Sequence, residues 1–151
     1  MNYKDLENIE YVYLEKIYEI QDNYLRLTFD RCKIEKDIDQ INNDDELCTY
    51  GSFEVDYTLP LIQIDFDWYI GYSVLNECFT VRDNYEKFIG KTFRIYTKSR
   101  YLDFIKAGTI ASVDYPGPFK HYGIVCLNHI IDVVSANEPI IKEIQRQNNN
   151  I

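Results

Sequence analysis

The chain has few of the residues on which catalytic and metal sites depend. Its 151 residues include two histidines, four cysteines, six glycines and one tryptophan. The cysteines are widely spaced single residues without a C-x-x-C pair, so we expect reduced thiols and no disulfide framework. Neither a glycine-rich phosphate loop nor a G-x-S-x-G elbow occurs. The sequence therefore predicts no catalytic residue, no metal ligand and no cofactor.

Positive charge is missing from residues 37–81, which contain no lysine, arginine or histidine. The same stretch has ten carboxylates: Asp37, Asp39, Asp44, Asp45, Glu46, Glu54, Asp56, Asp65, Asp67 and Glu77. Aromatic and β-branched residues run through it, which favours a folded acidic surface over a disordered tail. Such a surface attracts cationic partners.

The formal net charge of −9 is unevenly distributed. Residues 1–86 hold 20 acidic and 7 basic side chains, a net charge of −13. Residues 87–151 hold 5 acidic and 9 basic side chains, a net charge of +4. The two halves can therefore partly neutralise one another, through a basic stretch at Lys87–Lys106.

Long apolar runs are also absent. No stretch approaches 18 apolar residues, so we expect no membrane span. The polar, acidic start of the chain predicts no secretion signal, and we expect a cytoplasmic protein. Abundant Ile, Asn, Tyr and Lys with little Ala suggest an AT-rich, bacterial genome. Residues 1–151 predict a single domain, with a mobile loop at 37–46 and a frayed tail at 145–151.

Hydrophobic periodicity predicts a mostly β structure. Period-2 alternation or apolar runs indicate strands at 11–20, 25–29, 52–57, 61–70, 93–97, 109–113, 122–127 and 129–134. Ser99 has the position of an N-cap for a helix that ends before Gly108. Ser135 and Glu138 have capping-box spacing for a C-terminal helix. The sequence predicts an α+β fold dominated by β: a mainly antiparallel sheet or partly closed barrel with about two short helices.

The segments 52–57 and 61–70 alternate most regularly. If they form a hairpin, their apolar faces coincide only in registers that bring four carboxylates together on the other face: Glu54, Asp56, Asp65 and Asp67. Because neighbouring like charges cost a few tenths to about 1 kcal/mol each, we expect this face to serve a cationic partner. Three nearby tyrosines are the predicted anchors of that interface: Tyr50, Tyr57 and Tyr69.

Other interpretations of the acidic face stay open. It can be simply solvated, or it can be neutralised by Lys87–Lys106 of the same chain. A Mg²⁺ or Ca²⁺ site also uses clustered carboxylates, although carboxylates on a flat strand face seldom surround an ion.

The rival hypothesis is a small enzyme or ligand-binding β-barrel that uses His121, His129 and Asp132. Histidine beside a carboxylate is suited to acid–base catalysis. A histidine at each end of a buried strand is, however, more typical of a satisfied core, and Cys126 lies in an apolar run where a thiol is inert. Basic residues beside aromatics in Lys87–Lys106 suit nucleic acid, but the negative net charge disfavours such a partner.

In size, net charge, predicted β content and lack of catalytic motifs, the chain resembles the small acidic immunity proteins that bacteria keep beside toxins. The stretch KHYGIVCLNHIIDVVSANEPII is also similar to the C-terminal part of small uncharacterised bacterial β-rich proteins. The first resemblance implies a non-catalytic protein that neutralises a basic toxin domain, such as a nuclease. No diagnostic motif is matched, so no residue role follows. A homo-oligomer that joins acidic and basic halves is a further alternative.

Overall fold

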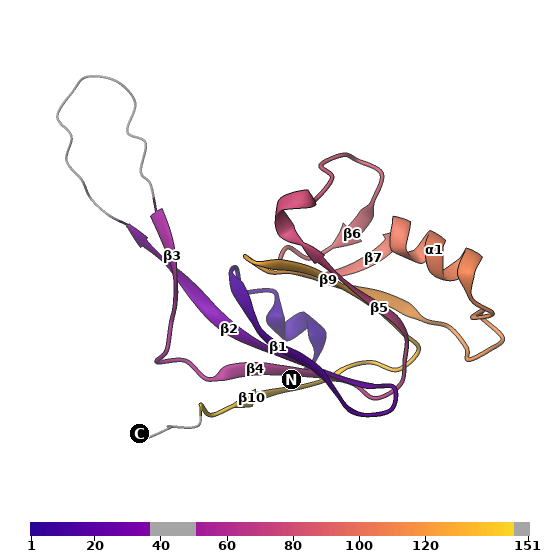
Figure 1. Cartoon of the computed structure of the whole chain (residues 1–151), viewed down its shortest axis with the longest axis horizontal. Helices are drawn as coiled ribbons and strands as arrows, with labels where there is room; N and C mark the ends of the chain where they lie inside the picture. Colours follow the sequence, from indigo (N-terminus) through magenta and orange to yellow (C-terminus); the bar gives the residue numbers. More distant parts are fainter. Residues whose placement is uncertain (37–50, 147–151) are drawn as a thin grey trace.

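The computed structural model describes residues 1–36 and 51–146, which form two antiparallel sheets packed face to face (Figure 1). The first sheet has the strand order β1 (Val12–Gln21), β2 (Tyr24–Lys36), β4 (Leu61–Phe66), β10 (Ile140–Ile144), with β3 (Gly51–Val55) also paired to β2. The second has the order β5 (Tyr69–Asn76), β9 (His129–Ser135), β8 (Lys120–Val125), β7 (Phe93–Lys98), β6 (Lys87–Ile89). The antiparallel, β-dominated prediction is confirmed, but neither sheet closes into a barrel.

Helical structure is limited to three short elements in this part of the chain. The α-helix α1 (Arg100–Gly108) packs on the outer face of the second sheet. Two 3₁₀ turns, η1 (Tyr3–Leu6) and η2 (Glu77–Phe79), precede β1 and follow β5. The predicted N-cap is confirmed, because the Ser99 hydroxyl accepts a hydrogen bond from the Leu102 amide at 2.9 Å. Gly108 is the last residue of α1 instead of the residue after it.

The main core lies between the two sheets. Leu27 and Phe29 of β2 and Ile64 of β4 are fully buried, as the alternation of their strands requires. Aromatic rings join the layers: the centroid of Phe29 lies 6.1 Å from that of Phe93 in β7. A strand period of two therefore places one face of each sheet in this core.

The hairpin expected between 52–57 and 61–70 does not form. Residues 25–29 of β2 pair with β4, and residues 32–36 of β2 pair with β3. The two acidic segments thus lie end to end along one edge of β2 and do not face each other. A turn at Asp67 and Trp68 also divides the predicted strand 61–70, and the chain crosses there to the second sheet.

The corrected pairing changes the electrostatics of the acidic segments. Asp65 lies opposite Arg26, and Glu54 lies opposite Lys33. Cross-strand pairs of opposite charge stabilise a sheet by roughly 0.2–1 kcal/mol, so the expected like-charge repulsion is replaced by attraction. The basic residues of β2 provide this compensation.

The predicted C-terminal helix is wrong, because residues 140–144 form β10. This strand pairs with β4, with Ile141 opposite Ile64 and buried beside it. A strand here provides hydrogen-bond partners for the second edge of β4, which a helix would leave without a ladder. The requirement for tertiary hydrogen bonds therefore overrides the local capping signal.

The strand predicted at 109–113 is not observed, and the predicted loop and tail lie largely outside the described residues. Residues 109–113 form no strand and contribute one isolated bridge, from Ser112 to Pro116. The predicted loop 37–46 and all but two residues of the predicted tail 145–151 lie outside the described residues.

Alkaline pH should destabilise the fold through a core tyrosine. Burial, with a smaller effect of Glu138, raises the pKa of Tyr122 from 10.0 to about 12. Because the folded state favours the neutral phenol, this contribution is complete below about pH 10 and is lost as the pH rises to about 12. We expect urea-unfolding free energies to fall across that window, and to fall less steeply in Tyr122→Phe. Parallel pH profiles of the two proteins would contradict this.

Candidate functional site

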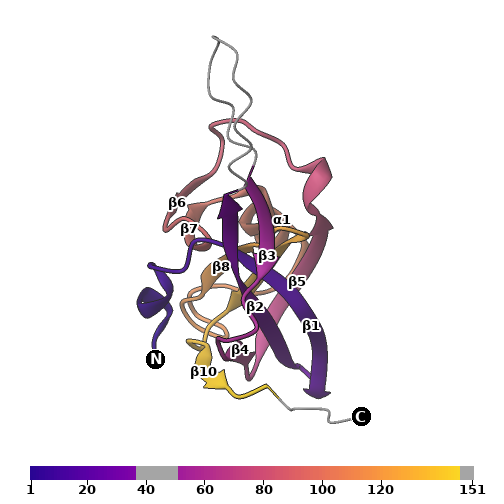
Figure 2. The same ribbon diagram turned by 90° about the vertical axis from the view of Figure 1, so that its left-hand side faces the viewer.

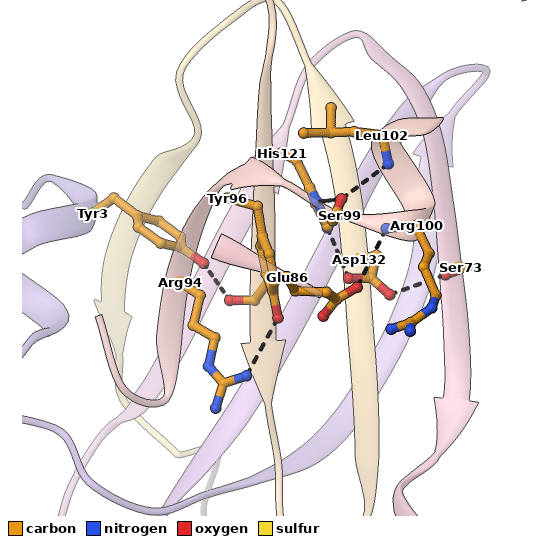
Figure 3. A network of polar contacts seen from close by, with 11 residues as sticks. Tyr3, Ser73, Glu86, Arg94, Tyr96, Ser99, Arg100, Leu102, His121 and Asp132 are labelled. Atoms are coloured by element: carbon orange, nitrogen blue, oxygen red, sulfur yellow. Dashed lines mark hydrogen bonds and ion pairs between the residues drawn. The ribbon is translucent and has the colours of Figure 1, made fainter. Parts of the chain in front are cut away.

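A buried polar cluster lies between the second sheet and the start of α1 (Figure 3). His121 of β8 is at its centre. The ring atom Nδ1 lies 2.7 Å from the Oγ of Ser99, and Nε2 lies 2.7 Å from an oxygen of Asp132 in β9. The second oxygen of Asp132 accepts a hydrogen bond of 3.3 Å from Ser73 of β5. Three strands and the helix N-terminus therefore meet at one imidazole.

One proton arrangement satisfies the whole cluster. The Ser99 oxygen accepts the Leu102 amide proton, so its own hydroxyl hydrogen is free to donate to Nδ1 of His121. The neutral ring then donates its Nε2 hydrogen to Asp132. Hydroxyl, imidazole and carboxylate follow the order of a hydrolase triad, with the hydroxyl on Nδ1.

The cluster is inaccessible, which separates it from a working triad. Ser99 is 0% exposed and His121 is 1% exposed. The ring of Tyr96 stacks on the imidazole with centroids 4.3 Å apart, and the ring of Tyr101 covers it at 5.6 Å. A nucleophile must contact its substrate, so the arrangement can fasten α1 to the sheet but cannot present Ser99 to a carbonyl group.

Two glycines make room for this aromatic cover. A Cβ atom on Gly123 would lie 2.4 Å from the ring of Tyr96. A Cβ atom on Gly71 would lie 2.8 Å from Ile105 and 3.1 Å from the hydroxyl of Tyr101. The missing side chains let the rings and the helix lie directly against the strands. The space around His121 is therefore filled by this chain itself.

The structure joins only part of the predicted catalytic trio. His121 and Asp132 are in contact, but side-chain alternation along β9 turns His129 to the opposite face from Asp132. The Nδ1 atom of His129 is buried without a partner. Cys126 is also buried, and burial raises the pKa of its thiol. Sequence identified Ser99 only as a helix cap, since no local spacing links it to His121.

Asp65 is a structural residue in this fold. It is 2% exposed, and Arg26 donates to both of its oxygens at 2.8 and 2.7 Å. Gln63 donates a third hydrogen bond of 3.0 Å. These contacts hold the pKa of Arg26 above its ordinary value. A carboxylate with this many internal partners is not available to another protein.

The other three carboxylates are more accessible but do not form one face. Glu54 is exposed on β3. Asp56 accepts hydrogen bonds from the amide and hydroxyl of Thr58 at 3.0 and 2.6 Å, which lower its pKa. Asp67, on the turn after β4, is exposed and accepts a hydrogen bond of 2.9 Å from Asn137. Glu54 and Asp56 are therefore neighbours, while Asp67 belongs to a different part of the surface.

The basic stretch Lys87–Lys106 has its own partners elsewhere. Lys91 pairs with Glu10 at 3.0 Å, and Arg100 pairs with Asp83. Within the described ranges, no ion pair joins this stretch to the four predicted carboxylates. The neutralisation expected from Lys87–Lys106 is supplied to Asp65 by Arg26 instead.

The three predicted anchor tyrosines have different environments. Tyr57 is 74% exposed, and the guanidinium of Arg146 lies over its ring at 5.0 Å. Tyr69 is half-buried and donates to Glu19, which raises its pKa to about 12. Tyr50 lies outside the described residues. Tyr57 is therefore the predicted anchor with a large free surface.

The paired ends of β2 and β3 form a narrow extension of the first sheet. We call residues 32–36 and 51–55 the β2–β3 ribbon; it extends away from the two packed sheets in Figures 1 and 2. On one side of it, Ile34 and Phe53 face each other and are 42% and 48% exposed. The ring of Tyr11 lies 4.8 Å from that of Phe53. An exposed apolar pair thus lies on one face of the ribbon, and alternation along β3 places Glu54 and the following Asp56 on the other face.

Comparisons with known proteins add no assignment. No protein-family model matches the chain, and no curated protein or solved structure is significantly similar to it. In residues 1–36 and 51–146, no three His, Cys, Asp or Glu side chains group closely enough to hold a metal ion. In the same residues, no helix has the length and apolar character needed to cross a membrane.

The two histidines should differ sharply in their effect on stability. His121→Leu leaves a buried hydroxyl and a largely buried carboxylate without their shared partner, so we expect it to lower the unfolding free energy by about 3 kcal/mol. His129→Leu removes a ring whose Nδ1 has no partner, and we expect less than half that loss. Chemical denaturation of both variants measures the difference. Equal losses would show that the His121 cluster does not stabilise the fold.

Proposed function

We propose that this protein is a non-catalytic binding module that presents the β2–β3 ribbon and the following Asp56–Tyr57 link to a basic protein. The observation that carries the proposal is that this short segment combines exposed apolar and aromatic side chains (Ile34, Phe53 and Tyr57) with accessible carboxylates (Glu54 and Asp56). Ile34 and Phe53 lie on one face of the ribbon and Glu54 on the other, so a partner that encloses the ribbon contacts both. Aromatic anchors supply binding energy at an interface, and charges at its rim increase the rate of encounter.

The charge of this region extends beyond the described residues. Residues 37–50, which connect β2 to β3 along the chain, contain five carboxylates and no basic residue. Their sequence therefore adds to the negative charge next to the ribbon. A field of this sign steers a basic protein toward the exposed pair Ile34 and Phe53.

The most concrete form of the proposal is an immunity protein that blocks a basic toxin domain, such as a nuclease. The size and acidity of the chain support it, as does the filled space around His121, which counts against the rival enzyme. An inhibitor of this kind needs fast association and a well-anchored interface, and it needs no accessible nucleophile.

The proposal is tested with the product of the neighbouring gene, which the immunity assignment predicts to contain a basic toxin domain. The variant Glu54→Gln/Asp56→Asn removes two charges and keeps an acceptor for Thr58, so the fold should be unchanged. We expect the association rate at low salt to fall about tenfold, because steering depends on charge. Phe53→Ala should instead raise the dissociation rate about tenfold or more. Stopped-flow and surface plasmon resonance measure the two rates.

The matched control is Asp22→Asn/Asp114→Asn, which removes two exposed charges away from the ribbon, one of them at the opposite end of β2. It should leave the association rate within about twofold of the wild type. If both double variants slow association equally, only net charge matters and the ribbon is not the docking element. If the neighbouring protein does not bind, the immunity assignment fails.

A further inference from the structure

β5 is an edge strand without the charged residues that commonly prevent pairing with another strand. It pairs with β9 on one side (Figure 1) and with no strand on the other in the described part of the chain. Its eight residues, YIGYSVLN, include no charged side chain and no proline. Tyr72, Val74 and Leu75 are 38%, 38% and 55% exposed. An exposed, uncharged edge of this kind is a template for strand addition.

The other free edges in these two sheets differ from β5. Each has at least one charged residue within its strand: Glu15, Lys16 and Glu19 in β1, Glu54 in β3, Lys87 in β6, and Lys142 and Glu143 in β10. β1 is also interrupted by two irregularities in its register. Charges and bulges are the devices by which edge strands avoid pairing. β5 has one such irregularity, between Tyr69 and Gly71 at its start, but among these edges only β5 has no charged residue.

The two ends of β5 differ in shape: a hollow lies at its start and an exposed aromatic side chain lies just past its end. At its start, Trp68, Tyr69 and Ile70 line a hollow of about 170 Å³ with residues 109–111, Tyr115 and Pro116. Just past its end, in η2, the ring of Phe79 is 82% exposed. An apolar hollow and an unburied aromatic side chain therefore lie at opposite ends of one free edge.

We propose that two copies of this chain associate through antiparallel pairing of their β5 strands. A two-fold axis that passes through Ser73 or Val74 places Phe79 of the second copy opposite Asp67 or Tyr69, beside the hollow. The same contact is made twice, because an interface with two-fold symmetry uses one patch on both subunits. The second copy supplies the side chain that fills the hollow of the first.

Charge distinguishes this dimer from one held by opposite charges. Each copy has a net charge of −9, so two copies repel each other at low salt. Because β5 itself is uncharged, added salt screens this repulsion and removes no attraction across the paired edges. Dimerisation through β5 should therefore strengthen with ionic strength. A dimer that joins the acidic half of one copy to Lys87–Lys106 of another should instead weaken as the ionic strength rises.

Sedimentation of the full chain at several concentrations and salt levels tests the dimer. We expect a species of twice the 18.0 kDa chain mass that becomes more abundant between about 50 and 500 mM NaCl. Val74→Lys adds a charge to the edge, and Phe79→Ala empties the hollow. Each should weaken dimerisation at least about tenfold. Hydrogen exchange of the amides in residues 71–76 should slow with concentration in the wild type and not in Val74→Lys.

Two controls match these variants. Ile89→Lys adds the same charge at a 61% exposed residue of β6, on the opposite edge of the second sheet, and Phe104→Ala removes a 62% exposed ring on α1. Both should dimerise like the wild type, and circular dichroism confirms that each variant is folded. A monomer at every concentration, a dimer unaffected by either β5 variant, or a dimer weakened by salt would each overturn the proposal. None of these results depends on the β2–β3 ribbon.

Discussion

The first sheet depends on the hydrogen bonding of β2 along both of its edges. β2 is 13 residues long and pairs with β1 on one side and with β4 and then β3 on the other. β4 has only six residues, so β2 extends beyond it, and the backbone groups of that extension are paired by β3 instead of by water. The part that extends past β4 forms the β2–β3 ribbon. The proposed docking element is thus a consequence of the length of β2.

The same pairing decides which of the acidic residues remain free. Arg26 and Lys33 of β2 lie opposite Asp65 and Glu54, yet the two pairs differ in burial. Asp65 is enclosed by hydrogen bonds from Arg26 and Gln63 and stabilises the sheet, whereas Glu54 stays in solvent. A buried ion pair needs several additional hydrogen bonds to offset desolvation, and Asp65 has them. Sequence periodicity alone cannot separate two carboxylates that occupy the same kind of position.

Local sequence patterns predicted those elements that depend on the residues of one short segment. Alternation identified most strands, and Ser99 was recognised as the N-cap of α1. The pairing of the strands could not be predicted from local patterns. β3 and β4 both pair with β2, and β10 pairs with β4, which lies more than 70 residues earlier in the chain. The contact of Ser99 with His121 depends on how α1 lies on β8, so it too is absent from any local pattern. Sequence therefore grouped His121 and Asp132 only within the rival hypothesis, together with His129, and it did not link Ser99 to them.

The distribution of polar groups also explains why both proposed interfaces lie at the edges of the sheets and not at His121. His121, the group best suited to chemistry, is covered by Tyr96 and Tyr101 and serves to hold α1 against the second sheet. With α1 fixed, one face of that sheet is covered and the other lies in the core, so its remaining unsatisfied backbone is at its edges. Side chains can be satisfied within one chain, but the outer edge of an edge strand can be satisfied only by water or by another strand. For β5, whose exposed residues carry no charge, pairing with another strand is the alternative that also buries apolar surface.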